Sequence, residues 1–261
     1  MGRQMDIDRT SGRSPLAFCV LVFALSLPLW VIGAITDRQL FPGLPLAALG
    51  VVCPLAAALI LVWRESSTSG VIALLKRLLD YKQIRAKAWY GPILLLMPGV
   101  SVASYGILRL QGTPLPTPQV SLLVASVMSL LFIVSALCEE IGWSGYATDP
   151  LQERSGALGA GILVGLVWAV WHFVPLIQAH RTLAWIAWWS LFTVALRILI
   201  VWIYNNTGKS VFAAALFHAI SNVCTVLFPA DFELLAPILA VVAAVVVVIW
   251  GPRTFTRPGG R

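Results

Sequence analysis

The chain has 261 residues, of which 59% are hydrophobic and only 11% are charged. Soluble globular domains carry roughly 25% charged residues, so this composition, with a mean hydropathy of +0.88, excludes most soluble and disordered classes of protein. The net charge of +7 does not by itself indicate a nucleic-acid partner, because basic residues gather in the cytoplasmic loops of membrane proteins. The composition predicts an integral, multi-pass membrane protein that lies among membrane lipids, in the plasma membrane if the source is bacterial.

Eight segments are apolar over about 20 residues, which is the length that a helix needs to cross the hydrocarbon core. The runs are continuous and do not alternate in polarity, so they do not resemble membrane strands. The sequence therefore predicts an all-α fold, a polytopic membrane helical bundle with about eight transmembrane helices. In chain order the predicted spans are about 16–36, 44–63, 89–108, 120–148, 156–175, 183–204, 210–228 and 234–250.

The basic residues predict the orientation of these spans. Fourteen of the 18 Lys and Arg residues fall in the N-terminal tail, the 64–88 and 149–155 loops, the 205–209 turn and the C-terminal tail. Because cytoplasmic loops are enriched in Lys and Arg, both termini are expected in the cytoplasm. The expected domains are a tail over 1–15, a membrane domain over 16–250 and a tail over 251–261. The 64–88 loop, in which basic residues alternate with leucines, is expected to form an amphipathic interfacial helix.

Very few polar groups interrupt the spans. Of the charged residues, only Glu139, Glu140 and Arg197 lie inside them, together with two histidines, His172 and His218, and the amide of Asn222. An ionisable group within the bilayer is costly and by default marks a functional site. Simpler explanations remain open: a histidine that only links two helices, a carboxylate pair at a membrane boundary, and an Arg197 that extends to the cytoplasmic surface.

Carboxylate and imidazole groups together suit the activation of water, since one takes a proton while the other orients the water or binds a metal. His218 and Asn222 are four residues apart and so share one helix face, where they could hydrogen-bond a developing oxyanion. Ser144 and Ser221 lie nearby, but no nucleophile-elbow pattern surrounds either one. The residues therefore predict a hydrolase that acts on an amide bond.

Three short patterns carry a resemblance to a known family. Residues 138–146 read CEEIGWSGY, residues 168–172 read WAVWH and residues 218–222 read HAISN. In that order they resemble the EExxxR, FxxxH and HxxxN motifs of the CPBP intramembrane endopeptidases, also called the Abi family, which includes type II CAAX prenyl endopeptidases and bacteriocin-processing or immunity proteins. The resemblance covers roughly residues 120–228.

The resemblance implies an intramembrane protease that hydrolyses a peptide bond in a membrane-proximal, CAAX-like protein substrate. It implies that Glu139 and His172 activate the water, that His218 and Asn222 form the oxyanion hole, and that Glu140 is a supporting acid. Both a metal-dependent and a metal-free mechanism have been argued for the family. Glu139, His172 and His218 are the candidate ligands for a divalent metal such as zinc.

The chain departs from the family motifs at two positions, where Ser144 replaces the arginine and Trp168 replaces the phenylalanine. Our hypothesis is that Arg197 supplies the missing cation, because it and the two glutamates lie at similar depths, roughly 10–13 Å from the cytoplasmic ends of their spans. His172 fits less well, since it lies roughly 24 Å along a span that begins at Gly156. Its convergence with the glutamates requires an irregular or displaced chain near 149–160.

Two other functions stay open on the sequence alone. The first is a non-enzymatic immunity or chaperone-like membrane protein of the same fold, which the loss of the motif arginine favours. The second is a proton-coupled transporter that uses the glutamates and histidines as a relay. Transporters often consist of two related halves with broken helices, and no such symmetry is visible in this sequence.

Overall fold

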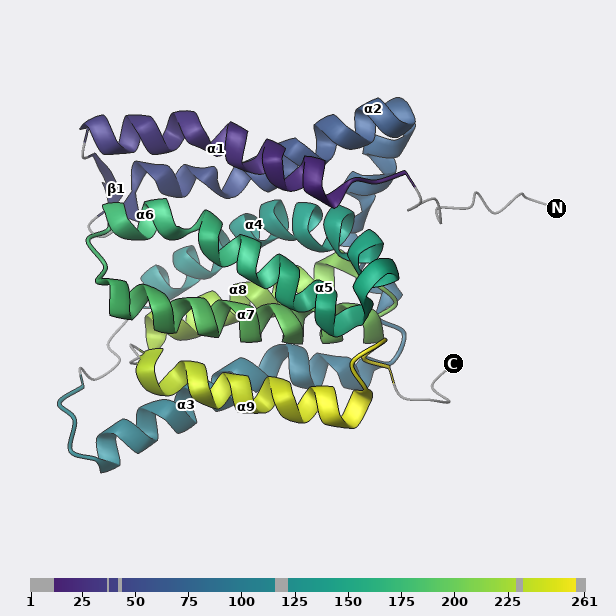
Figure 1. The fold of residues 1–261 in the computed structure, drawn as a ribbon. Helices are drawn as coiled ribbons and strands as arrows, with labels where there is room; N and C mark the ends of the chain where they lie inside the picture. Colours follow the sequence, from purple (N-terminus) through teal and green to yellow (C-terminus); the bar gives the residue numbers. More distant parts are fainter. Residues whose placement is uncertain (1–11, 37, 42–43, 116–121, 229–231, 257–261) are drawn as a thin grey trace.

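The computed structural model describes residues 12–36, 38–41, 44–115, 122–228 and 232–256. Within these residues the chain forms a bundle of α-helices, which confirms the predicted all-α membrane fold (Figure 1). The helices, in chain order, are α1 (Pro15–Thr36), α2 (Cys53–Lys76), α3 (Tyr90–Leu110), α4 (Leu122–Gly142), α5 (Asp149–Trp171), α6 (Phe173–Gln178), α7 (Leu183–Asn206), α8 (Val211–Leu227) and α9 (Phe232–Trp250).

Short elements connect the long helices. A π-helix, η5 (Trp143–Thr148), follows α4 directly, and a small antiparallel pair of strands, β1 (Gln39–Phe41) and β2 (Leu44–Pro45), follows α1. The sequence did not predict the strand pair. The remaining elements are 3-10 turns: η1 (Leu46–Val52), η2 (Arg77–Leu79), η3 (Tyr81–Gln83) and η4 (Lys87–Trp89).

Six helical stretches among the described residues are long and apolar enough to cross a membrane, and α8 is a shorter apolar helix. One of the six, Ala125–Gln178, has 54 residues. As a straight helix it would be about 80 Å long, far more than the roughly 30 Å of the hydrocarbon core. The chain instead reverses within it, because Glu139 on α4 contacts Trp168 on α5. The chain is thus a multi-pass membrane protein, and the number of eight spans stays a prediction.

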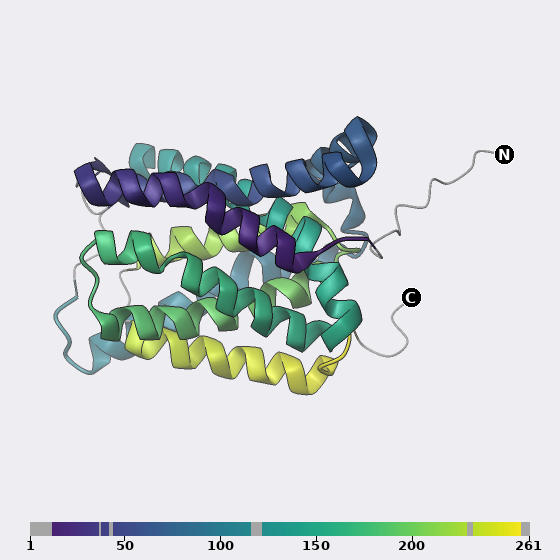
Figure 2. The same ribbon diagram turned by 45° about the horizontal axis from the view of Figure 1, so that its top comes forward.

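The bundle is arranged so that α1, α5, α7 and α9 follow one another across the molecule in both views (Figures 1 and 2). Helix α1 begins and α9 ends at the same end of the bundle (Figure 1). We call it the basic end and define it by Arg13, Arg77, Lys209 and Arg253. There Arg13 and Arg77 both donate to the carbonyl of Gly145, and Arg77 also donates to the carbonyl of Lys209. The carbonyl of Arg253 accepts the backbone N–H of Ala157. The cytoplasmic position of the termini remains a prediction, and residues 1–11 and 257–261 lie outside the described residues.

Three connections differ from the prediction. Residues 149–155, expected to be a loop, form the first turns of α5, which is then kinked at Gly156 (φ 72°, ψ 174°). The segment 64–88, expected to form one interfacial helix, is divided: two helical pieces of α2 meet at Ser67, the second ends at Lys76 with Leu74 buried, and short 3-10 turns follow. Residues 251–256, expected to belong to the C-terminal tail, fold back so that Phe255 is buried and the carbonyl of Arg253 accepts the backbone N–H of Ala157. Burial of apolar side chains favours all three arrangements over solvated loops.

The start of α8 is fixed from the basic end. A helix leaves its first N–H groups without partners, and an acidic side chain there satisfies them and complements the helix dipole. Asp80 does this by accepting the backbone N–H groups of Val211 and Phe212 at 3.2 and 3.0 Å, and the hydroxyl of Ser210 at 2.6 Å. This contact sets the position of α8, which carries His218 seven residues further on.

Close helix packing at the end of α4 depends on Gly142, the residue two positions after Glu140. A Cβ atom at Gly142 would lie 2.6 Å from the carbonyl oxygen of Pro54 on α2 and 2.8 Å from the ring of Phe18 on α1. The backbone oxygen cannot move without shifting α2. The sequence therefore places a glycine where three helices meet.

We predict that Gly142→Ala lowers the free energy of unfolding by about 1–3 kcal/mol, the usual effect of inserting a methyl group into a packed core. The matched control is Gly106→Ala on α3, where a Cβ atom meets nothing within 4 Å. Unfolding of both variants in detergent micelles would measure the difference. Equal stabilities of the two variants would contradict this description of the α4 contact.

Candidate active site

Three helices bring four polar residues of the spans together. Glu139 and Glu140 lie in the last turn of α4, Arg197 lies in the middle of α7, and His218 lies in the middle of α8. All four side chains are buried, with exposed fractions between 0% and 4%. The structure thus brings these four residues into one cluster, because the contacts described next connect each of them to a glutamate or to a shared aromatic ring.

Glu140 is surrounded by hydrogen-bond donors. Arg197 donates from Nη1 to Oε2 and from Nη2 to Oε1, both at 2.8 Å, which is the bidentate geometry of a strong charge-assisted pair. Ser144 donates its hydroxyl to Oε2 at 2.5 Å. His218 Nδ1 lies 3.1 Å from Oε1. The sequence hypothesis that Arg197 lies against Glu140 agrees with this geometry, and Ser144, at the position of the motif arginine, adds a further donor.

Glu139 has different surroundings. Its Oε2 accepts one hydrogen bond, from the indole Nε1 of Trp168 at 2.7 Å. Among the described residues, no donor contacts its other oxygen, Oε1. Adjacent positions on a helix point about 100° apart, so Glu140 faces α7 and α8 while Glu139 faces α5.

Trp168 lies at the centre of the cluster. Its ring centroid is 4.9 Å from that of His218 and 5.6 Å from that of His172, and the Arg197 guanidinium carbon lies 4.4 Å from it. Helical side chains point back toward the helix N-terminus. The indole of Trp168 therefore extends back along α5, and there it contacts Arg197. Trp168 keeps an aromatic ring at the position of the motif phenylalanine, and its N–H makes a contact that phenylalanine cannot make.

His172 follows Trp168 by one turn, at the C-terminal end of α5. Its Nδ1 is 2.9 Å from the carbonyl oxygen of Trp168, and its ring packs against Trp171 and Trp189 at centroid distances of 4.6 and 5.0 Å. No hydrogen bond joins His172 to either glutamate among the described residues. His172 thus joins the cluster through its contacts with Trp168.

Asn222 follows His218 by one turn on α8 and is half-buried. Its backbone carbonyl accepts the hydroxyl of Thr225, whereas its amide makes no hydrogen bond to the part of the chain that the structure describes. Trp189 was not predicted as a neighbour of the site. Because it lies on an apolar helix among other tryptophans, the sequence carries no signal that separates it from a lipid-facing residue.

Glu139, His172 and His218 are the three candidate ligands for a metal ion. A catalytic zinc site needs three protein ligands around one point. Among the described residues, no group of three His, Cys, Asp or Glu side chains is placed to hold a metal ion. The arrangement of Glu139, His172 and His218 thus does not fit a metal in this conformation, and we derive no step through one.

The turn that follows the glutamates is held by arginines from the basic end. Residues 143–148 are fully buried, and the carbonyl of Gly145 accepts hydrogen bonds from Arg13 at 3.1 Å and from Arg77 at 2.9 Å. Arg77 also donates to the hydroxyl of Tyr204 at 2.7 Å. π-Helical turns are frequent at functional sites, and here the turn places Ser144 against Glu140. The sequence places Arg77 in the 64–88 loop. No sequence signal links it to Gly145, which is 68 positions away.

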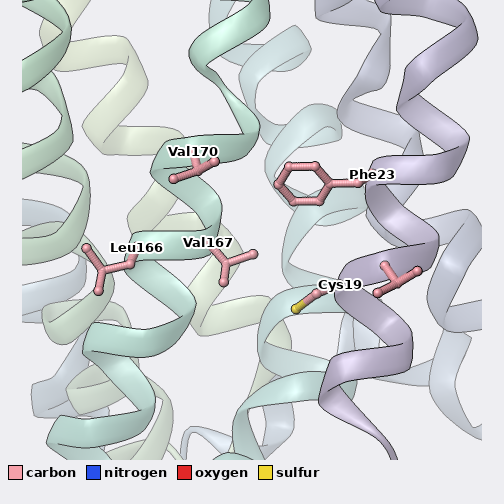
Figure 3. A pocket seen from close by; sticks show the side chains of 6 residues that line it. Cys19, Phe23, Leu166, Val167 and Val170 are labelled. Carbon is pink, nitrogen blue, oxygen red and sulfur yellow. The ribbon is translucent and has the colours of Figure 1, made fainter.

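One apolar hollow lies away from this cluster. It is an apolar groove of about 450 Å³ between α1 and α5, lined by Cys19, Val20, Phe23, Leu166, Val167 and Val170 (Figure 3). Along α5 these residues lie on the helix face opposite Gly165, Trp168 and His172. Neither Glu139 nor Glu140 lines this groove, and their side chains are 4% and 0% exposed.

Comparisons with known proteins agree with the sequence resemblance. A family model described as "Type II CAAX prenyl endopeptidase Rce1-like" matches residues 121–224, which include every residue of the cluster. The protein named CAAX prenyl protease 2 from Methanococcus maripaludis is 27% identical over 226 residues, which cover 80% of this chain and 83% of that protein. The similarity therefore extends over the bundle as well as over the three motifs.

Proposed function

We propose that this chain, which belongs to the CPBP family of membrane endopeptidases, hydrolyses a peptide bond in a membrane-proximal substrate with a water that Glu139 activates. The observation that carries the proposal is the unequal environment of the two adjacent glutamates. Glu140 accepts four hydrogen bonds and Glu139 accepts one.

Glu140 has no capacity left for a water molecule. A carboxylate offers about four lone-pair positions, and Arg197, Ser144 and His218 occupy four of them. Its role is therefore to hold Arg197 and His218 in place within the apolar bundle. Glu139 keeps Oε1 for a water, which makes it the better general base of the pair.

The histidine partners support distinct roles. His172 Nδ1 faces a carbonyl oxygen and so must donate, which leaves the lone pair of the neutral ring on Nε2. His172 can thus accept a proton or orient a water. His218 Nδ1 donates to Glu140, so its Nε2 is a donor when the ring is doubly protonated. The Asn222 amide supplies N–H donors in either state.

In the proposed reaction, Glu139 takes a proton from water while the water oxygen attacks the peptide carbonyl carbon. The tetrahedral oxyanion is stabilised by His218 and Asn222, as donors aimed at a developing charge do in other acyl-transfer enzymes. The C–N bond then breaks, and the proton held by Glu139 passes to the leaving amine. The products are a carboxylic acid and an amine, and no oxidant or other reactant is required.

The non-enzymatic alternative loses its main argument. That argument rested on Ser144 in place of the motif arginine. A guanidinium is nevertheless present at Glu140, because Arg197 reaches the same carboxylate from α7. This buried ion pair therefore supports a functional site at Glu140 even without the motif arginine.

For the substrate we propose a CAAX-type C-terminus, because both the family description and the name of the Methanococcus protein refer to CAAX and prenyl groups. The test uses the purified full chain in lipid vesicles with two peptides that end in Cys-aliphatic-aliphatic-X. One peptide carries a prenyl thioether on its cysteine and the other does not. We expect cleavage of the prenylated peptide with the higher kcat/KM. Cleavage of neither peptide under conditions in which the Methanococcus protein cleaves would overturn the proposal.

A further inference from the structure

We propose that Trp168 is a positioning residue whose indole N–H fixes the orientation of the Glu139 carboxylate. The inference deepens the proposed function, because it rests on Glu139 being the general base. It starts from a residue difference: the resembling family motif has phenylalanine at this position, and phenylalanine has no N–H group. The chain therefore holds its base with a hydrogen bond that the motif residue cannot supply.

The contact between the two side chains is well formed. Nε1 lies 2.7 Å from Oε2, and both side chains are buried, at 3% and 4% exposure. The terminal torsion of a glutamate is broad and roughly two-fold, so an unrestrained carboxylate samples many orientations. A short hydrogen bond to one oxygen removes this freedom. It leaves Oε1 as the oxygen that receives the proton from water.

The indole is itself held by the other members of the cluster. Arg197 lies against its face at 4.4 Å, a cation–π geometry, and His218 contacts it edge-to-face at 4.9 Å. Gly165, one turn before Trp168, lets α5 approach α7 closely, because a Cβ there would lie 3.2 Å from the Cβ of Arg197. The residue that pairs with Glu140 thus also orients the tryptophan that holds Glu139.

This arrangement gives one structural reason for two departures from the motifs. Arg197 enters from α7 in place of an arginine at position 144, and its guanidinium lies against the face of the aromatic residue at position 168. Trp offers a better cation–π face than Phe and adds the donor for Glu139. The two departures are therefore coupled through a single ring.

The test compares two changes at position 168. Trp168→Phe restores the motif residue and loses the N–H. Trp168→benzothienylalanine, introduced at that single codon, keeps the size and shape of the indole and replaces only the N–H by sulfur. We expect both variants to lower kcat by about 10- to 100-fold, as misplacement of a reacting group by about 1 Å does. KM should change less than about threefold, because a base that is misplaced only for the reaction does not weaken substrate binding.

Trp202→Phe is the matched control. Trp202 is also buried, and its indole N–H makes no hydrogen bond in the described part of the chain. This variant leaves a similar cavity, so any loss of thermal stability common to positions 168 and 202 reports packing alone. The kcat of Trp202→Phe should stay within about twofold of the wild type.

The outcomes separate the two proposals. An inactive wild-type protein would refute the proposed function, whatever the variants do. An active wild type with an unchanged kcat for the benzothienylalanine variant would overturn the role of Trp168 and leave the proposed function standing. A lowered kcat in that variant, at wild-type thermal stability, is the expected result. If Trp168→Phe fails to fold, the isosteric variant alone decides.

Discussion

Replacing Arg197 with Ala is expected to lower the free energy of unfolding by about 3–5 kcal/mol, the range measured when one partner of a buried ion pair is removed. The change takes away two of the four donors of Glu140, whose side chain is fully buried. The carboxylate cannot reach water, so it stays in an apolar environment without a cation. Equilibrium unfolding in mixed micelles, for the wild type and the variant, measures the difference.

A second substitution tests whether an arginine introduced at position 144 can replace Arg197. Ser144 already lies within hydrogen-bond distance of Glu140 Oε2, and Arg197→Ala vacates the space of a guanidinium beside the same carboxylate. Adding Ser144→Arg to Arg197→Ala restores the arginine of the motif, and we expect it to recover part of the lost stability and activity. A double variant no more stable than the single one, or a single variant as stable as the wild type, would contradict the proposed equivalence.

Glu139→Gln is expected to reduce kcat by about 10²- to 10⁴-fold, the usual contribution of a general base. Glutamine has nearly the same shape, and its amide oxygen can still accept the Trp168 N–H, so the fold should be retained. Initial rates of peptide cleavage in vesicles measure the effect, and thermal unfolding of the same preparations verifies the folding.

Ser221→Ala provides the control for this experiment. Ser221 is buried next to Asn222 and its hydroxyl has no partner among the described residues, so it is the remaining candidate for a serine nucleophile. We expect this variant to keep activity within about twofold. Activity lost in Ser221→Ala and kept in Glu139→Gln would replace the water mechanism by a serine mechanism.

Much of the fold and part of the site could be predicted from the sequence. The apolar spans require helices because backbone groups in lipid must find partners within the segment. Charges are so rare in those spans that Glu139, Glu140 and Arg197 were visible at once, and simple depth arithmetic paired Arg197 with the glutamates. The same arithmetic fitted His172 less well and required an irregular chain near 149–160, and in the structure a π-helix over 143–148 and a kink at Gly156 precede it.

The remaining features depend on contacts between distant residues. Nothing in the local sequence indicates that Arg77 holds the carbonyl of Gly145, or that residues 149–155 continue as helix before the kink at Gly156. The role of Trp168 was missed because aromatic residues were treated as equivalent by size. Only the geometry distinguishes an indole N–H that points at Glu139 from one that has no partner, as at Trp202.

The central claim is that the intramembrane cluster hydrolyses a peptide bond, and one measurement tests it most directly. Purified wild-type protein in vesicles is incubated with the prenylated peptide, and all products are weighed by mass spectrometry. The account predicts two fragments whose masses together exceed that of the substrate by one water, formed in amounts well above that of the protein. An intact substrate, or no more fragments than vesicles with the Glu139→Gln variant release, would contradict it.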